Sequence, residues 1–263
     1  MAIKRYRLWV QFNDKFASRI HAMEARIARV DKIEKPILDR RRMELRLNGW
    51  RGSNKVLEFV DVAKSFGAKK VFSGVNETIW HGERVGLIGP NGAGKSVMLR
   101  MILGREMPDV GEIKIGPSVS VGYYAQEHET LDFNQTVVDS IRYAGEMSES
   151  RATAFLLRYL FTYKQVSQKI GELSGGERSR LQLAQVVLSG ANFLLLDEPT
   201  NNLDIASAEV LEQALEDFEG TVLVISHDRY FLDRTVERLL VIENGCLAQY
   251  LGGYSDYLET TRR

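Results

Sequence analysis

Residues 89–96 read GPNGAGKS and match the pattern G-x-x-x-x-G-K-[ST], which wraps a phosphate group in many proteins. Glycines there allow positive φ angles and a close approach of the backbone to the phosphate. Lys95 has the reach to contact the β- and γ-phosphates of a nucleoside triphosphate, and the hydroxyl of Ser96 is a suitable ligand for Mg²⁺. The stretch therefore predicts a site for a triphosphate with magnesium.

The flanks of this stretch decide between a phosphate site and a Gly-rich turn that binds nothing. Residues 84–88 are mostly apolar and predict a buried strand, whereas residues 96–103 predict a helix. Strand, loop and helix in that order are the context that the motif requires. Backbone N–H groups at the start of the helix would add to the anion cradle, so we favour the phosphate site.

Two carboxylates follow a second apolar run. Residues 193–196 read FLLL and precede Asp197 and Glu198. A continuous apolar run is typical of a parallel strand buried on both faces, and ligands bind beyond the carboxyl ends of such strands. We expect Asp197 to hold Mg²⁺ through water and Glu198 to polarise a water for in-line attack on the γ-phosphate.

Three further residues are candidates for the same site because of their positions relative to the expected sheet or to Lys95. His227 follows the apolar run 221–226 and would share a sheet edge with Asp197, within reach of a γ-phosphate. Gln126 ends the expected strand 118–125. Phe66 precedes Lys95 by twenty-nine positions and could stack on a purine base.

A helix start lies at residues 173–177, which read LSGGE. Ser174 with Glu177 three residues later fits a capping box, which is the purely structural interpretation. Gly175 and Gly176 would leave bare backbone N–H groups at the helix start, which favours an anion site as well. The preceding residues 134–170 are helical in pattern and predict a small helical subdomain.

Composition places the chain among ordinary soluble α/β proteins. It has 263 residues, no net charge, 44% hydrophobic residues and one cysteine, Cys246. The single cysteine excludes an intrachain disulfide and fits a reducing compartment, and we expect its side chain in the core. No apolar run approaches twenty residues and no signal-peptide pattern opens the chain, so we expect a cytoplasmic protein without a membrane span.

The first fifty residues differ from the rest. They hold thirteen Lys and Arg against six Asp and Glu, a net charge of +7. Between Lys15 and Lys35 the apolar residues follow an a/d seam of about two heptads. The seam consists of Phe16, Ile20, Met23, Ile27 and Val30. A helix this short is marginal alone, so we expect the seam to pack on the body, to pair with another copy, or to have its partner elsewhere.

The charge of this arm has two interpretations. A solvated charged helix explains it, and so does a polyanionic partner reached through phosphate contacts. Residues 48–54 resemble a turn and linker, which suggests an arm at 1–54 and a body at 55–263. Within the body, alternating patterns predict antiparallel strands at 55–61 and 76–80, and an Asn-Gly turn joins the expected strands 239–242 and 246–250.

GPNGAGKS, Gln126, LSGGE, FLLLDE and His227 stand in the order that ATP-binding cassette (ABC) proteins show, and the chain resembles that family over residues 55–263. Three segments resemble the F subfamily, which consists of soluble ABC ATPases that act on ribosomes. They are EPTNNLD at 198–204, SHDRYFLD at 226–233 and the ending YLGGYSDYLE. Residues 15–50 resemble the second helix of the linker between the two cassettes of such proteins. The resemblance implies an α/β fold of the P-loop NTPase ABC type. It has a parallel core sheet, an antiparallel β subdomain and a helical subdomain near residues 127–172, and a basic helical arm precedes it.

The resemblance also assigns roles. Phe66 matches the aromatic that stacks on the base, and His227 matches the switch residue. The phosphate loop and the next helix position correspond to Gly89, Pro90, Asn91, Gly92, Ala93, Gly94, Lys95, Ser96 and Val97. Ser96, Gln126 and Asp197 would surround Mg²⁺, and Glu198 would be the general base. The signature is matched by Ser174, Gly175, Gly176 and Glu177, and the loop that connects the two ATP sites by Asp204.

In that family each ATP lies between the phosphate loop of one cassette and the signature of another, whereas this chain has one of each. The resemblance therefore implies an ATPase that needs a second cassette, its own copy or another chain, with ATP and Mg²⁺ as cofactors. The arm would contact the ribosome or transfer RNA. The alternatives are the ATP-hydrolysing subunit of a membrane transporter and a non-catalytic ATP-binding module. Stacking on Phe66 is not base-specific, so GTP remains an alternative nucleotide.

Overall fold

The computed structural model describes residues 43–126 and 128–261. The a/d seam lies outside these residues. Contacts divide the chain into residues 1–41 and residues 42–263, and the second unit, which we call the body, carries all the elements described below.

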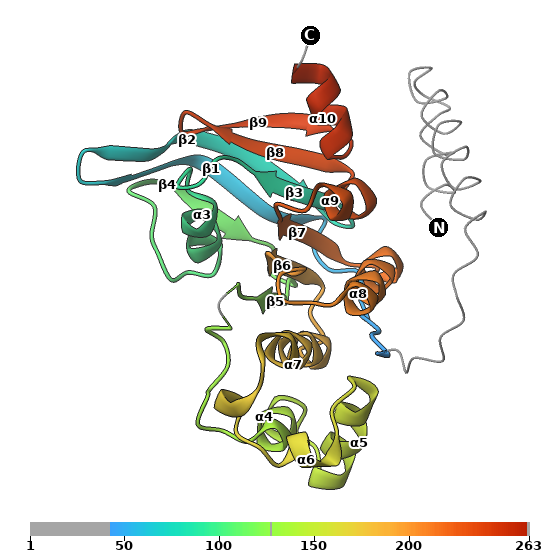
Figure 1. Ribbon diagram of the computed structural model, residues 1–263. Coiled ribbons are helices and arrows are strands. Elements are labelled where there is room, and N and C mark those ends of the chain that lie inside the picture. Colours follow the sequence, from blue (N-terminus) through green and yellow to red (C-terminus); the bar gives the residue numbers. More distant parts are fainter. Residues whose placement is uncertain (1–42, 127, 262–263) are drawn as a thin grey trace, which may run out of the picture. The chain divides into compact units, whose positions relative to one another are not determined.

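Two sheets and a helical subdomain make up the body (Figure 1). The strands of the antiparallel sheet run in the order β2-β1-β4, with β1 Lys55–Phe66, β2 Lys69–Trp80 and β4 Val110–Ile115. The larger sheet has the order β5-β6-β7-β3-β8-β9. Its strands are β3 Arg84–Ile88, β5 Val121–Tyr124, β6 Phe193–Asp197, β7 Thr221–Ile225, β8 Arg238–Glu243 and β9 Cys246–Leu251.

All neighbouring strands of the larger sheet are parallel except β8 and β9. Because successive side chains of a strand point to opposite faces, the apolar runs of β6 and β7 supply two separate cores. Leu194 and Leu196 pack into the core beneath the helices, whereas Phe193 and Leu195 pack into the core shared with the antiparallel sheet. This explains why residues 193–196 of β6 and residues 222–225 of β7 are all apolar.

The helices surround the larger sheet and extend to one side of it. They are α3 Lys95–Ile102, α4 Val137–Ala144, α5 Glu149–Arg158, α6 Tyr163–Val166, the 3₁₀ turn Ile170–Glu172, α7 Gly175–Leu188, α8 Ile205–Asp217, α9 Arg229–Thr235 and α10 Tyr254–Thr261. In Figure 1, α4, α5 and α6 gather beyond α7, away from the two sheets. They form the helical subdomain that the sequence predicts.

Two expectations from the sequence need correction. Residues 43–54 form no helix or strand, as expected of a linker, but they belong to the body rather than to the arm: Met43 and Leu45 are buried, and the N–H of Glu44 donates to the carbonyl of Arg158 at 3.0 Å. Cys246 is exposed rather than buried, because it begins β9 directly after the turn, on the edge strand of the sheet.

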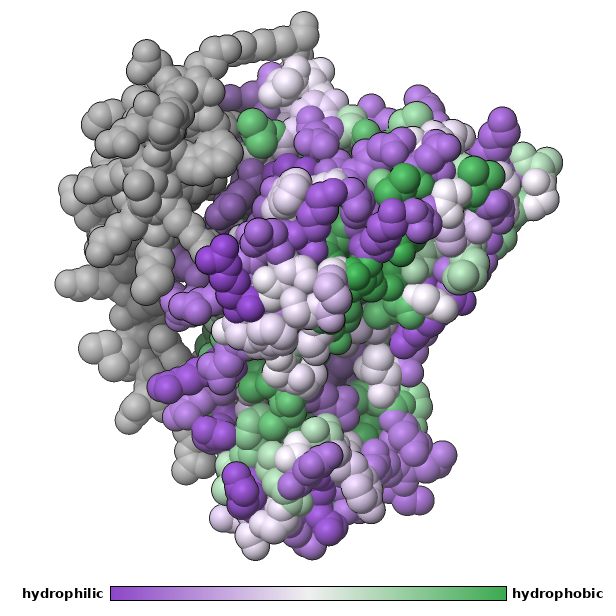
Figure 2. Space-filling view, turned by 180° about the vertical axis from the view of Figure 1, so that it is seen from behind, coloured by the Kyte–Doolittle hydropathy of each residue, from purple (hydrophilic) through white to green (hydrophobic). Residues whose placement is uncertain are grey.

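The surface of the body mixes polar and apolar side chains. Figure 2 shows small hydrophobic groups between hydrophilic residues on the face opposite to that of Figure 1. Among the described residues, no helix combines the length and the apolar character that crossing a membrane requires.

Candidate nucleotide-binding site

The loop between β3 and α3 is shaped by its glycines. Gly92 and Gly94 have φ angles of 75° and 115°, in the region that residues with a Cβ avoid. A Cβ on Gly94 would lie 2.5 Å from Cγ1 of Val71 and 2.8 Å from Cζ of Phe72, so the loop rests directly on β2. Gly94 also caps α3 without any side-chain hydrogen bond, which leaves the N–H groups of the first turn available to an anion.

Lys95 places its ammonium group inside this loop. Its Nζ donates to the carbonyl of Gly89 at 2.8 Å and to that of Pro90 at 3.3 Å. Burial lowers the pKa of Lys95, and the charges of Glu198 and Asp197 oppose that shift. A half-buried cation beside free N–H groups can neutralise a polyphosphate.

Asp197 and Glu198 stand at the carboxyl end of β6 with side chains that are 6% and 5% exposed. Glu198 has a φ of 51°, a strained conformation for a residue with a Cβ, and its N–H donates to the carbonyl of Ile225 on β7 at 2.9 Å. Oε2 of Glu198 accepts a hydrogen bond from the N–H of His227 at 3.1 Å. The neighbouring strands β6 and β7 thus bring the carboxylates and His227 together at one edge.

The electrostatics of the two carboxylates follow from their burial. Burial raises the pKa of Asp197 to about 6, the charge of Glu198 adds to the rise and Lys95 opposes it. Burial also raises the pKa of Glu198, whereas the hydrogen bond from the N–H of His227 lowers it by a smaller amount. Oε1 of Glu198 is buried without a hydrogen-bond partner among the described residues and lies 3.5 Å from Nε2 of His227. This oxygen is therefore available to accept a proton from a water molecule.

The donor set beside Asp197 fits Mg²⁺. The Asp197 carboxylate, the Ser96 hydroxyl and the Gln126 side-chain amide all line the same cavity and supply oxygen atoms, which this hard cation prefers. No cluster of three or more His, Cys, Asp or Glu is found among the described residues, and a set built from one carboxylate, one hydroxyl and one amide agrees with that result.

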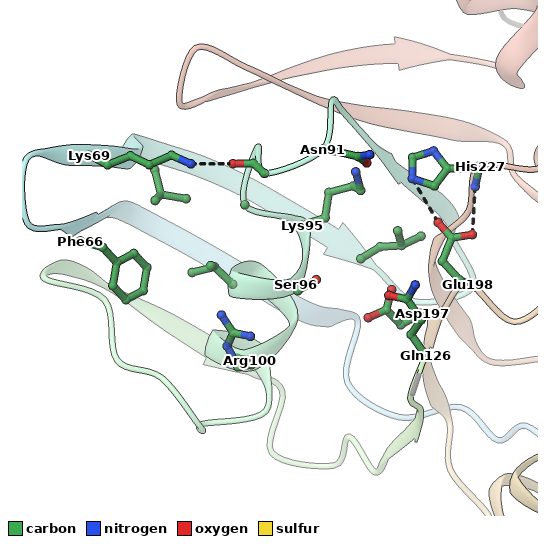
Figure 3. Close-up of a pocket in the computed structure, with 15 residues that line it drawn as sticks. Phe66, Lys69, Asn91, Lys95, Ser96, Arg100, Gln126, Asp197, Glu198 and His227 are labelled. Atoms are coloured by element: carbon green, nitrogen blue, oxygen red, sulfur yellow. Dashed lines mark hydrogen bonds and ion pairs between the residues drawn. The ribbon is translucent and has the colours of Figure 1, made fainter. Parts of the chain in front are cut away.

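These side chains surround one cavity of about 580 Å³ (Figure 3). It brings together many of the residues that the sequence singles out, namely Phe66, Asn91, Gly92, Gly94, Lys95, Ser96, Val97, Gln126, Asp197, Glu198 and His227. Four lining residues were not predicted from the sequence: Lys69, Val71, Arg100 and Ile225. Helical spacing could have revealed Arg100, which is four residues beyond Ser96 and three beyond Val97, on the same face of α3.

Three residues of the phosphate loop lie elsewhere. Gly89 and Pro90 line a smaller cavity of about 270 Å³, which Lys95 and His227 also border. Ala93 packs against the core under the antiparallel sheet. The loop therefore separates the two cavities.

The signature residues and Asp204 do not line either cavity. Ser174 and Glu177 form the expected capping box at the start of α7, with the Glu177 carboxylate accepting from the N–H of Ser174 at 2.7 Å. A Cβ on Gly176 would lie 2.9 Å from the carbonyl oxygen of Asn202, so the signature packs directly on the loop before α8. Asp204 caps α8 by accepting from the N–H of Ser207 at 2.8 Å.

A parallel sheet, a phosphate loop and an apolar strand that ends in two carboxylates define the class of P-loop nucleotide-binding cassettes. The family model described as "ABC transporter" matches residues 72–201. The chain belongs to the ABC ATPases, and its relatives place it in the F subfamily.

Three relatives are each 37% identical to this chain. "Uncharacterized ABC transporter ATP-binding protein YfmR" of Bacillus subtilis (strain 168) aligns with 99% of this chain and 42% of its own length. For "ABC transporter F family member 5" of Arabidopsis thaliana the shares are 96% and 37%. For "Energy-dependent translational throttle protein EttA" of Escherichia coli (strain K12) they are 97% and 47%. The chain thus spans less than half the length of these relatives.

Solved structures support the same fold. The ATP-binding subunit of an ABC transporter superimposes with a TM-score of 0.66 at 23% identity, over 79% of this chain and 93% of its own. The cassette MJ0796, a post-hydrolysis dimer bound to ADP and phosphate, superimposes with a TM-score of 0.61 at 24% identity, over 74% of this chain and 98% of its own.

Proposed function

We propose that this chain binds and hydrolyses ATP and does so only when a second cassette faces it. One observation carries the proposal. Glu198, His227 and Lys95 share a cavity, whereas the signature residues 174–177 lie outside it on a separate surface. A site that holds the phosphate loop and the carboxylates but lacks the signature has half of the groups that an ABC ATPase uses.

Each side of the cavity has its own task in this proposal. Phe66 stacks on the base, and residues 89–97 hold the phosphates through backbone N–H groups and the ammonium of Lys95. Ser96, Gln126 and Asp197 hold Mg²⁺, which neutralises phosphate charge when it is bound. The positions of Phe66, Lys95 and the three proposed Mg²⁺ ligands around one cavity support these roles.

Glu198 is the general base of the hydrolysis. Its Oε1 takes a proton from a water molecule, whose oxygen attacks the γ-phosphorus. The bond between that phosphorus and the bridging oxygen breaks, its electron pair stays on ADP, and phosphate is released. A buried carboxylate with a raised pKa is a better base, and His227 keeps it in place through the bond to Oε2.

The second cassette supplies what the cavity lacks. Residues 174–177 and Asp204 form one exposed region of this chain, since Gly176 packs on the loop that leads to Asp204. We propose that this region contacts the γ-phosphate of ATP held by the opposite cassette. That cassette is a second copy of this chain or a different one.

Light scattering of the Glu198→Gln variant tests the pairing. Blocked hydrolysis should trap the closed pair, so Mg-ATP should double the mass, and ADP should not. Lys95→Ala/Glu198→Gln is the control and should stay monomeric under both nucleotides. A Glu198→Gln chain that binds ATP and remains a monomer would contradict pairing with itself and leave a different cassette as the partner.

We further propose that the chain acts on the ribosome as a translation factor or as part of one. Two lines support this step: a relative is called an energy-dependent translational throttle protein, and the first fifty residues carry a net charge of +7. Co-sedimentation with ribosomes in Mg-ATP tests it, with membrane vesicles as the competing partner. Binding to vesicles and not to ribosomes would overturn it in favour of a transporter subunit.

A further inference from the structure

We call the end of the 580 Å³ cavity where Phe66 lies its base end. Two cationic side chains at this end have no role in the triphosphate chemistry proposed above. Figure 3 shows Phe66, Lys69 and Arg100 together at the end of the cavity away from Glu198 and His227. Lys69 comes from β2 and Arg100 from α3, so they border the cavity from two elements. Val71 and Val97 also line the cavity.

Phe66 is prepared as a stacking surface. Phe66 is 46% exposed, and the ammonium of Lys64 lies 5.2 Å from the centroid of its ring. Lys64 is itself fixed, because it is buried and forms ion pairs with Glu106 at 2.7 Å and Asp109 at 3.2 Å. A ring held by a fixed cation on one side offers its remaining exposed surface to a base.

The polar side chains at this end can only donate hydrogen bonds. The guanidinium of Arg100 is exposed and forms no hydrogen bond or ion pair with the described residues, and Lys69 donates to the carbonyl of Gly92 at 3.2 Å. Neither side chain has an acceptor atom. Guanine, hypoxanthine and adenine all present an acceptor at N7. At position 6 guanine and hypoxanthine present the acceptor O6, whereas adenine presents the N6 amino donor. The available chemistry therefore matches 6-oxopurines better than adenine.

We propose that Arg100 and Lys69 recognise 6-oxopurines at the base end of this site by donating hydrogen bonds to them. GTP and ITP then bind at least as tightly as ATP. The inference rests on the proposed nucleotide binding and names the base that the same site accepts.

Competition with a fluorescent ATP analogue in the presence of Mg²⁺ tests this proposal. The dissociation constants of ATP, GTP and ITP are measured for the unmodified chain and for Arg100→Met and Lys69→Met. Methionine keeps an apolar stem and removes the charge at an exposed position, so folding should be retained. ITP lacks the 2-amino group of GTP, so a comparison of ITP with ATP isolates recognition at position 6.

The unmodified chain should bind GTP and ITP at least as tightly as ATP, and each substitution should shift the ITP-to-ATP preference toward ATP by about fivefold. Lys70→Met and Arg151→Met are matched controls, because both residues are exposed and neither lines the cavity. They should leave the preference unchanged.

Two results would overturn the proposed preference for 6-oxopurines without contradicting nucleotide binding. The first is ATP binding more tightly than both oxopurines in the unmodified chain. The second is an equal loss for all three nucleotides in Arg100→Met and Lys69→Met, which would place these cations on the phosphates or the ribose. Failure of every nucleotide to bind would instead overturn the proposed function itself.

Discussion

Glu198 and His227 contact each other twice across the ends of neighbouring strands. The backbone N–H of His227 donates to Oε2 of Glu198 at 3.1 Å, and Nε2 of its ring lies 3.5 Å from Oε1. The first contact depends only on the backbone N–H, so it survives substitution of His227 by any residue except proline. The ring, which is 62% exposed, serves only the second contact and whatever lies in the cavity beside it.

This division predicts unequal losses of activity. Glu198→Gln should lower phosphate release by about 10²-fold or more, because the base is gone, and should leave nucleotide affinity unchanged. His227→Ala should lower it less, because the backbone N–H still orients Glu198. Both are measured by phosphate release and by binding of a fluorescent ATP analogue. An equal loss in the two variants would mean that the ring itself is essential for the proton transfer.

We predict that Gly94→Ala lowers stability by more than backbone strain alone would, because the new Cβ would also clash with β2. Gly94→Ala places a Cβ at a φ of 115° and within 2.8 Å of both Val71 and Phe72. Gly104→Ala is the control, since Gly104 has a φ of 68° and no atom near its Cβ position. We expect urea unfolding to show about 1 kcal/mol lost for Gly104→Ala and about 3 kcal/mol for Gly94→Ala, with nucleotide binding lost only in the latter. Equal losses would contradict the close packing of the loop on β2.

Much of this site could be predicted because its signals are local. The phosphate loop, the capping box at Ser174 and the Asn-Gly turn each depend on residues a few positions apart. The turn is confirmed by φ angles of 51° at Asn244 and 80° at Gly245. The end of β6 at Asp197 also follows from a run of adjacent apolar residues.

Other features depend on contacts between distant parts of the chain and could not be predicted. Lys69 reaches the cavity because the β1–β2 hairpin lies beside the phosphate loop, and its bond to Gly92 joins residues twenty-three positions apart. Residues 48–54 look like a linker because they contain Gly and polar residues, yet Trp50 donates to the carbonyl of Gly190 at 3.2 Å. Only the folded body supplies these partners.

The docking of this segment leads to a prediction about stability. Met43 and Leu45 are buried and Glu44 and Arg46 are exposed, which is the alternation of an extended chain with one face on a core. Leu45→Ala should lower the free energy of unfolding by about 2 kcal/mol, and Arg46→Ala should change it by less than about 0.5 kcal/mol. Urea titration measures both. A Leu45→Ala loss no larger than that of Arg46→Ala would mean that the segment does not pack on the body in solution.

A buried ion pair joins the two sheets and predicts a non-additive result. Nη1 of Arg238 on β8 lies 2.9 Å from Oε1 of Glu77 on β2, and the Glu77 side chain is 3% exposed. Gln249 on β9 donates to the other oxygen of Glu77 at 2.6 Å. Arg238→Met should therefore lower the free energy of unfolding by about 3–5 kcal/mol, because it leaves the Glu77 charge buried beside an apolar side chain.

The double variant Glu77→Gln/Arg238→Met separates loss of the pair from loss of packing. It removes the uncompensated charge, and the new amide oxygen can still accept from Gln249. We expect it to be more stable than Arg238→Met alone by about 1 kcal/mol or more, because a neutral amide costs less to bury than a carboxylate. Urea titration of the single and double variants measures the difference. A double variant less stable than Arg238→Met would show that Glu77 stabilises the contact between the sheets through its hydrogen bond with Gln249 rather than through its charge.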